Sequence, residues 1–278
     1  MWLIFALITA FCWGLSTTFI KKSYESFSPI IAVILGGFAG IIILLPFALI
    51  NGAKLVFWPL VPVATLAAAS YIFYFYALER GKLALTGTVL TIYPLFTIIL
   101  AALFLSEVTT TIAKIGIVTI LFGLIFLSLE KFSGLKNIKL GAWLWWGLTG
   151  AALSGLGDFL AKAMVSNFDA YSYSLAFVIG WLITAFVMFM FDKRRTLPKS
   201  FNQNAIFLIL AEVLLFLGYM FLYLALKDGL ASIVVPISAS YSVLSLFLAL
   251  VWLKEKISKP QILGAVLTII GVIIVSTK

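Results

Sequence analysis

The chain contains an internal duplication, and this constrains its fold more than any other feature. Residues 71–125 align without a gap to residues 219–273, at a constant shift of 148 positions, and about 14 of the 55 aligned positions are identical. The matching residues that are not leucines are the informative ones, because a leucine-rich chain matches leucines by chance. They include the pairs Tyr71 and Tyr219, Gly81 and Gly229, Tyr93 and Tyr241, Glu107 and Glu255, Gly116 and Gly264, and Gly123 and Gly271.

Both copies are hydrophobic enough to lie in a bilayer. Of the 278 residues 64% are hydrophobic and 10% are charged, and the mean hydropathy is +1.20, whereas a soluble domain is about 45–50% apolar and about 25% charged. Helices that are apolar all round are stable when lipid is the solvent. The net charge is +9, but the basic residues are scattered and form no face for nucleic acid. The expected surroundings are the lipid bilayer, at whose surface the basic residues lie.

Ten stretches are long and apolar enough to cross a membrane, which takes roughly 20 residues per helix. Charged or turn-forming residues separate them, and Ser258 before Lys259-Pro260 is a candidate cap for the last helix. The expected spans are 2–20, 29–50, 58–78, 83–105, 112–130, 140–163, 171–191, 205–226, 229–253 and 259–277.

The duplication divides these spans into two sets of five. We expect a first repeat at 1–131, a linker at 132–139 and a second repeat at 140–278. The front of the repeat uses a shift of 141, which matches Gly14 with Gly155 and Lys21 with Lys162. A unit of five spans ends on the opposite face from its start, so the second copy begins inverted. The predicted fold is an all-α membrane protein with ten transmembrane helices in two inverted five-helix repeats.

The chain resembles the drug/metabolite transporter superfamily, specifically its ten-helix EamA-type exporters. The resemblance covers essentially the whole length and is carried by the ten spans, the two repeats and a segment that closes each half. That segment reads Leu-Ser-Glu107 before Gly116 and Gly123 in one half, and Leu-Lys-Glu255 before Gly264 and Gly271 in the other. It implies alternating access around a central cavity, and export or exchange of small organic solutes such as amino acids.

The orientation and the membrane are separate expectations. Loops after the odd-numbered spans carry 14 of the 19 basic residues. The positive-inside rule therefore places those loops in the cytoplasm and both termini outside, whereas the resemblance implies cytoplasmic termini. We leave this open, and expect a multi-pass protein of the cell (inner) membrane.

Aromatic residues are the main candidates for solute binding. The repeat-equivalent pairs Tyr71 and Tyr219, and Tyr93 and Tyr241, can line a cavity where the halves meet, each offering an apolar ring and one polar tip. An aromatic belt at the membrane surface is the alternative, but the mid-span tyrosines favour the cavity. The complete predicted set is Trp13, Tyr71, Tyr74, Thr91, Tyr93, Trp146, Tyr219, Ser238 and Tyr241.

Prolines interrupt two of these spans. Pro94 in the fourth and Pro236 in the ninth each remove a backbone donor, so we expect kinks there. The nearby hydroxyls of Thr91, Ser238 and Ser240 can bond freed carbonyls or contact solute.

Two acids inside the spans are candidates for ion coupling. A charge in the apolar zone costs about 2.5–3.5 kcal/mol on insertion scales, so it usually faces protein or water. Asp158 either pairs with Lys162 four residues later or binds a proton or an ammonium group. Glu212 has no partner that the sequence identifies. Glu107 and Glu255, in contrast, are expected to be solvated acids near helix starts.

Glycines seven residues apart in the fifth and tenth spans predict that these helices pack closely on each other, because small residues let backbones approach in lipid. Gly36 and Gly40 give the second span a similar face. With no histidine and one cysteine, Cys12, we expect no metal site and no cofactor.

The predicted function is secondary transport, most simply export, of a small amphipathic metabolite such as an amino acid. The alternatives are a proton-coupled exporter of lipophilic cationic drugs and, from another class, a non-transporting membrane scaffold. An enzyme is not expected, because no cluster of acids, histidines or nucleophiles lies at one depth. The partners are a small-molecule substrate and the bilayer, and a monomer is compatible with the sequence.

Overall fold

The computed structural model describes residues 1–24, 26–80, 92–127, 129, 142–193, 203–252, 254 and 256–277, with only the backbone for 77–80 and 142–144. Every regular element in these ranges is a helix, as the sequence predicts. The predicted linker 132–139, Thr91 and Glu255 lie outside them. The helices are α1 (Trp2–Ser23), α2 (Pro29–Ile50), α3 (Leu60–Arg80), α5 (Tyr93–Phe104), α6 (Thr111–Leu127), α7 (Ala142–Asn167), α8 (Ala170–Phe191), α9 (Gln203–Asp228), α10 (Ala231–Ala239), α11 (Tyr241–Val251) and α12 (Lys259–Ser276).

The helices lie where the apolar stretches predict them, and their described ends are displaced by four residues at most, except that α5 begins at Tyr93, inside the predicted span 83–105. Six spans of the described chain are long and apolar enough to cross a bilayer, counting α10 and α11 as one, and three other apolar helical stretches are shorter. Many large apolar side chains on the outside of the bundle are exposed. Lipid, and not water, is the solvent that such a surface requires.

The ninth span is broken and not merely kinked, because α10 ends at Ala239 and α11 begins at Tyr241. Ser240 Oγ donates to the carbonyl of Ile237 at 2.6 Å, and Ser242 Oγ to that of Ala239 at 2.9 Å. These hydroxyls compete with the backbone for the carbonyls that would continue the helix. The break therefore lies at the serines, beyond Pro236 itself.

The described part of the fourth span, α5, begins at the equivalent position. α5 begins at Tyr93, the repeat equivalent of Tyr241. The turns that contain the two tyrosines are alike, since Leu95 N donates to Ile92 O and Val243 N to Ser240 O, both at 2.9 Å. Both tyrosines thus begin a helical segment, at positions that the sequence places inside the predicted spans 83–105 and 229–253.

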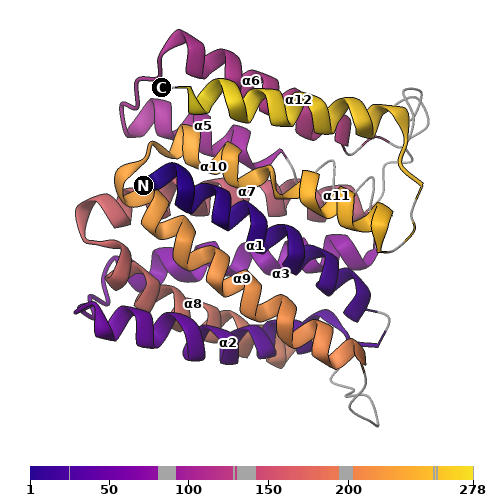
Figure 1. Ribbon diagram of the computed structural model, residues 1–278. Coiled ribbons are helices and arrows are strands. Elements are labelled where there is room, and N and C mark those ends of the chain that lie inside the picture. The colour runs from indigo at the N-terminus through magenta and orange to yellow at the C-terminus, as the bar shows by residue number, and fades with distance from the viewer. Residues whose placement is uncertain are drawn as a thin grey trace.

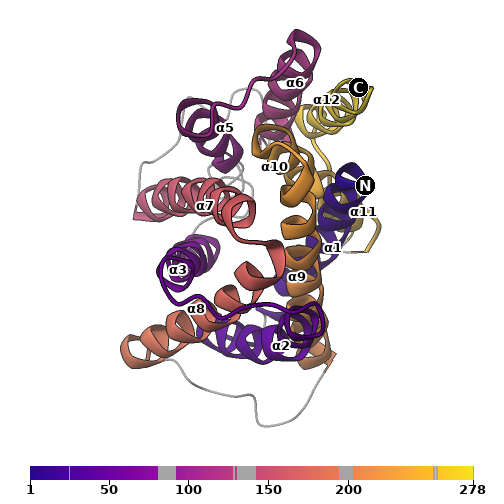
Figure 2. The same ribbon diagram turned by 90° about the vertical axis from the view of Figure 1, so that its left-hand side faces the viewer.

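The contacts between helices reveal a two-fold relation. The repeat makes α1 equivalent to α7, α2 to α8, α3 to α9, α5 to α11 and α6 to α12. α1 packs along α9 as α7 packs along α3, and α2 meets α9 as α8 meets α3. α6 pairs with its equivalent α12 at one end of the bundle, and α2 with α8 at the other (Figures 1 and 2). Exchanging the two halves therefore maps these principal helix pairs onto one another.

Local hydrogen bonds follow the same relation. Thr97 Oγ1 donates to the Gly155 carbonyl at 3.0 Å, and Ser245 Oγ to the Gly14 carbonyl at 3.1 Å. Thr97 and Ser245 are equivalent at the shift of 148, and the two glycines at 141. The same hydrogen bond thus occurs twice, and its donors and acceptors are related by the two sequence shifts, 148 and 141.

The halves are inverted with respect to each other. Each contributes five crossings, so the second begins on the face opposite to the first, and the axis that relates them lies in the membrane plane. The helices run roughly from left to right in Figure 1, and both chain termini lie on the left-hand face. An even number of membrane crossings requires the two termini to be on the same face.

The predicted contact between the glycine faces of α6 and α12 is confirmed. A Cβ on Gly123 would lie 2.9 Å from the carbonyl oxygen of Gly264, and one on Gly116 would lie 3.0 Å from that of Gly271. The backbones therefore touch, as expected of small residues in lipid. This pair forms one edge of the bundle and supplies no side chain to the cavity described next.

Candidate functional site

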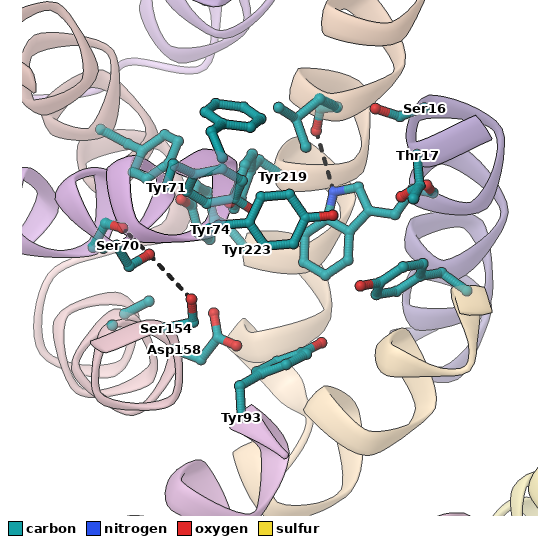
Figure 3. Close-up of a pocket in the computed structure, with 18 of the residues that line it drawn as sticks. Ser16, Thr17, Ser70, Tyr71, Tyr74, Tyr93, Ser154, Asp158, Tyr219 and Tyr223 are labelled. Carbon is teal, nitrogen blue, oxygen red and sulfur yellow. Dashed lines mark hydrogen bonds between the residues drawn. The ribbon is translucent and has the colours of Figure 1, made fainter. Parts of the chain in front are cut away.

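A cavity lies where the two halves meet, between α1, α3, α5, α7, α8, α9 and α11. Figure 3 shows side chains from several of these helices converging on it. About 70 Å³ is open to the centre of a water molecule, which is room for roughly five waters at about 10–15 Å³ each. In this conformation the site is therefore small and tightly lined.

Seven of the predicted residues line this cavity, and they come from both halves of the chain. Trp13 lies near the middle of α1, and Asp158 lies well inside α7, nine residues before its end. The cavity is thus near mid-membrane depth. The seven are Trp13, Tyr71, Tyr74, Tyr93, Asp158, Tyr219 and Tyr241.

The cavity lies on the pseudo-two-fold axis. Trp13 and Ser154, and Thr17 and Asp158, are equivalent at the shift of 141, and all four line it. At the shift of 148 the same holds for the tyrosine pairs and for Phe75 with Tyr223. The site is therefore built twice from equivalent positions, with the same residue type at the two tyrosine pairs and different types at the other pairs.

Trp13 is the aromatic residue with the best-defined orientation. Its Nε1 donates to the carbonyl of Leu215 on α9 at 3.3 Å, which fixes the indole and uses its one donor. Its ring lies 5.3 Å from that of Tyr219 and 6.0 Å from that of Tyr241, both edge-on. Such edge contacts are favourable for aromatic rings and make one face of the cavity rigid.

Further rings continue this wall. Tyr71 contacts Tyr219 at 5.9 Å, and Tyr173 contacts Tyr223 at 4.9 Å between ring centroids. The hydroxyls of Tyr93 and Tyr173 are buried without a hydrogen-bond partner among the described residues. Hydroxyls that no described residue satisfies are available to a solute or to water.

Asp158 brings the charge to this site. Its carboxylate points into the cavity toward the ring of Tyr93 (Figure 3). The expected alternative, a pair with Lys162, is wrong, because Lys162 Nζ donates to the carbonyl of Leu226 on α9 at 2.7 Å. Among the described lining residues Asp158 is the one acid, and there is no lysine or arginine. The described lining of the cavity is thus aromatic, with one acidic side chain.

Three predicted residues do not line the cavity. The Trp146 ring packs at a tilt against those of Phe73 and Tyr76, with ring centroids 5.3 Å apart in both cases. It lies about two turns before Ser154 along α7 and so nearer the membrane surface. Ser238 is fully buried in α10, where the break at Ser240 separates its direction from that of Tyr241. Glu212 is buried against α2.

Sequence reasoning missed several lining residues. Ser154 and Thr17 could have been found, because they are the repeat equivalents of Trp13 and Asp158. Tyr223 lies one helical turn after Tyr219, which was also a usable signal. Tyr173 gave none, since its equivalent at the shift of 141 is Ala32.

Glu107 has a structural role that corrects the expected solvated acid. Its carboxylate accepts hydrogen bonds from the backbone N–H of Ala231 at 2.8 Å and of Ser232 at 2.9 Å, and from Ser232 Oγ at 2.6 Å. A loop of the first half thus caps the first turn of α10 in the second half, where a negative charge is favourable.

A duplicated, inverted bundle of membrane helices with a cavity on its axis is the architecture of a membrane transporter. Comparison with known proteins agrees. The chain belongs to the EamA-like transporter family, which it matches over residues 1–129 and 141–277. The resemblance drawn from the sequence is thereby confirmed, and the protein is a multi-pass membrane protein.

Relatives and a solved structure add to this result. An uncharacterized transporter of Archaeoglobus fulgidus is 26% identical over 282 residues, covering 100% of this chain and 99% of that protein. An uncharacterized protein of Methanocaldococcus jannaschii is 31% identical over 130 residues, which is 47% of this chain but 93% of that protein. Nearly the whole of this relative, which is about half as long as the present chain, thus matches about half of the chain. A crystal structure with 15% sequence identity has the same fold, with a TM-score of 0.77 over 99% of this chain and 96% of that one.

Proposed function

We propose that this protein is a secondary transporter that exports small organic solutes carrying an ammonium group and an apolar part, amino acids foremost. The cell membrane is the proposed location. The halves expose the central cavity alternately to the two faces. The observation that carries the proposal is the lone carboxylate of Asp158 in an aromatic cavity on the axis between the repeats.

The lining chemistry favours a cationic nitrogen. An ammonium group can pair with Asp158, and the faces of Trp13 and the tyrosines attract cations through their π systems. An apolar side chain of the solute fits the same rings. A strongly anionic solute lacks a partner, because no lysine or arginine is present among the described lining residues.

The size of the cavity supports a small solute. The open space corresponds to a few water molecules, so a neutral amino acid requires modest widening and a large drug requires much more. Because one chain supplies both halves of the lining, a single copy forms a complete cavity, and we propose that the monomer is active.

The test is solute counterflow in proteoliposomes with purified protein. Labelled neutral amino acids, primary aromatic amines and lipophilic cations form the panel. We expect flux of an amino acid or amine. Competition by lipophilic cations at comparable concentrations would favour the alternative of drug export, which the same carboxylate and rings support. Flux of none of these compounds would refute the proposal and favour the scaffold alternative.

Asp158→Asn tests the role of the acid. A hydrogen bond to a charged group contributes about 1.5–3 kcal/mol, so solute affinity should fall roughly 10- to 150-fold at 1.4 kcal/mol per tenfold. Asp228→Asn is the matched control, since Asp228 is exposed at the end of α9. Equal affinity of the Asp158 variant and the wild type would exclude the ammonium contact.

A further inference from the structure

Two equivalent helix crossings in this bundle differ at their centres. α8 crosses α3 where a Cβ on Gly180 would lie 2.6 Å from the backbone nitrogen of Thr65 and 2.7 Å from the carbonyl carbon of Ala64. α2 crosses α9 where a Cβ on Gly36 would lie 2.7 Å from Oε2 of Glu212. Glu212 is the repeat equivalent of Ala64. The same position is therefore an alanine at the crossing of α3 with α8 and a glutamate at the crossing of α9 with α2.

The Glu212 carboxyl group is buried, away from water and from polar partners among the described residues. The side chain is 1% exposed, and neither oxygen has a hydrogen-bond partner within the described part of the chain. Gly36 leaves room for it, and one turn further Gly40 leaves room for the ring of Phe216. The small-residue face predicted for α2 thus packs on α9 around this acid. A buried ionised carboxylate without a partner is very unfavourable, so the neutral acid is the form that fits this packing.

No described charge nearby offers an alternative partner. α2 and α10 contain no titratable residue, and α8 presents Trp181 at this point. The other titratable residues of the helices packed on α9 lie near helix ends or on the cavity, except for Cys12, which is buried in the middle of α1. They are Cys12, Lys21 and Lys22 of α1, Asp158 and Lys162 of α7, Tyr171 and Tyr173 of α8, and Tyr219, Tyr223, Lys227 and Asp228 of α9 itself.

Glu212 lies behind the wall of the solute cavity. The same Gly36 Cβ position that meets Glu212 lies 3.0 Å from Trp181 Nε1. The Trp181 ring lies 5.1 Å from that of Tyr71, which lines the cavity. Trp181 Nε1 donates to the Val33 carbonyl at 2.8 Å, so the indole links α8 to α2 beside the acid. A solute in the cavity does not touch Glu212, yet only two rings separate them.

We propose that Glu212 is a proton-binding site, separate from the solute cavity, whose occupancy controls how α2 packs on α9 and thereby couples solute movement to a proton gradient. This rests on the proposed transport function. In the binding step hydronium transfers a proton to a carboxylate oxygen of Glu212, one O–H bond forms, and water leaves. A metal ion would need several oxygen ligands, whereas a proton needs one.

The direct test follows the carboxyl group itself. Infrared difference spectra of the purified protein across a pH titration report the carbonyl stretch of protonated carboxyl groups. We expect a band in the wild type that Glu212→Gln removes and that Asp158→Asn and Asp228→Asn retain. A band unchanged in Glu212→Gln would overturn the proposal. Glu212→Ala is the second variant if the glutamine variant does not fold, because alanine is the residue at the equivalent position, Ala64.

The coupling test uses proteoliposomes with an imposed pH gradient and the panel compound that gives counterflow. Glu212→Gln should keep counterflow and lose accumulation driven by the gradient, while Asp228→Asn keeps both. Accumulation by Glu212→Gln at the wild-type level would refute the coupling. If the wild type moves no compound of the panel, the transport function fails, and the infrared band still decides whether Glu212 binds a proton.

Discussion

The contact between α6 and α12 gives the sharpest test of the fold. A Cβ on Gly264 would lie 2.3 Å from the backbone nitrogen of Leu127 and 2.6 Å from the carbonyl oxygen of Gly123. Ordinary van der Waals contact begins at 3.4 Å, so a side chain at this position must push the helices apart by about 1.1 Å. Backbone atoms cannot rotate away as a flexible side chain can.

The expected cost follows from that displacement. A gap of about 0.5–1 Å forfeits a quarter to a half of the dispersion energy of each atom pair along the crossing. In lipid no hydrophobic effect compensates, because packing itself drives helix association. One inserted methyl group costs about 1–3 kcal/mol, and alanine regains about 1 kcal/mol of helix propensity over glycine. We expect Gly264→Ala to lose up to about 2 kcal/mol, and Gly264→Val, with two more carbons, more than about 3 kcal/mol.

The assay is thermal unfolding of the purified protein, with Val266→Ile as the matched control. Val266 lies on α12 with 47% of its surface exposed, so this substitution adds a methyl group on the lipid side. We expect melting temperatures to fall from wild type through Gly264→Ala to Gly264→Val, with the control unchanged. Because α6 and α12 do not line the cavity, counterflow per folded molecule should be preserved. A Gly264→Val protein as stable as the control would refute the backbone contact.

Two caps make further predictions. Glu107→Gln replaces one acceptor oxygen with an amide that faces the N–H groups of α10, and should lower the stability by about 1–2 kcal/mol. An unchanged melting temperature would show that the bridge between the halves contributes nothing. Ser258→Ala removes the capping box with Gln261 at the start of α12, at a cost of about 1 kcal/mol that Ser258→Thr should largely avoid. Equal stability of the alanine and threonine variants would contradict this.

Most of the fold could be predicted because membrane helices can be identified in a sequence by their length and apolar composition. The duplication then supplied the arrangement, since an odd number of spans per copy requires inversion. The cap at Ser258 and the glycine pairs of α6 and α12 were equally readable, and both are confirmed. These features depend on spacing along the chain, which the sequence gives directly.

The direction of individual side chains was harder to predict. Helices that are apolar on every side carry little periodicity to show which face is inside. Glu212 and Tyr219 lie two turns apart on α9, yet one is packed on α2 and the other lines the cavity. The break at Ser240 changes the rotation of the chain between Ser238 and Tyr241. Repeat equivalence was the better guide, and it placed both tyrosine pairs in the cavity.

The inverted duplication also indicates where the chemistry must lie. On the proposed mechanism, exchanging the roles of the two halves converts one facing state into the other, so contacts that occur twice contribute equally to both. A bias between the two states, and its response to a ligand, must then come from positions where the halves differ. Two such positions are Asp158, whose repeat equivalent is Thr17, and Glu212, whose repeat equivalent is Ala64. One lies in the solute cavity and the other behind its wall, which is the separation that coupling of two ligands through one conformational change requires.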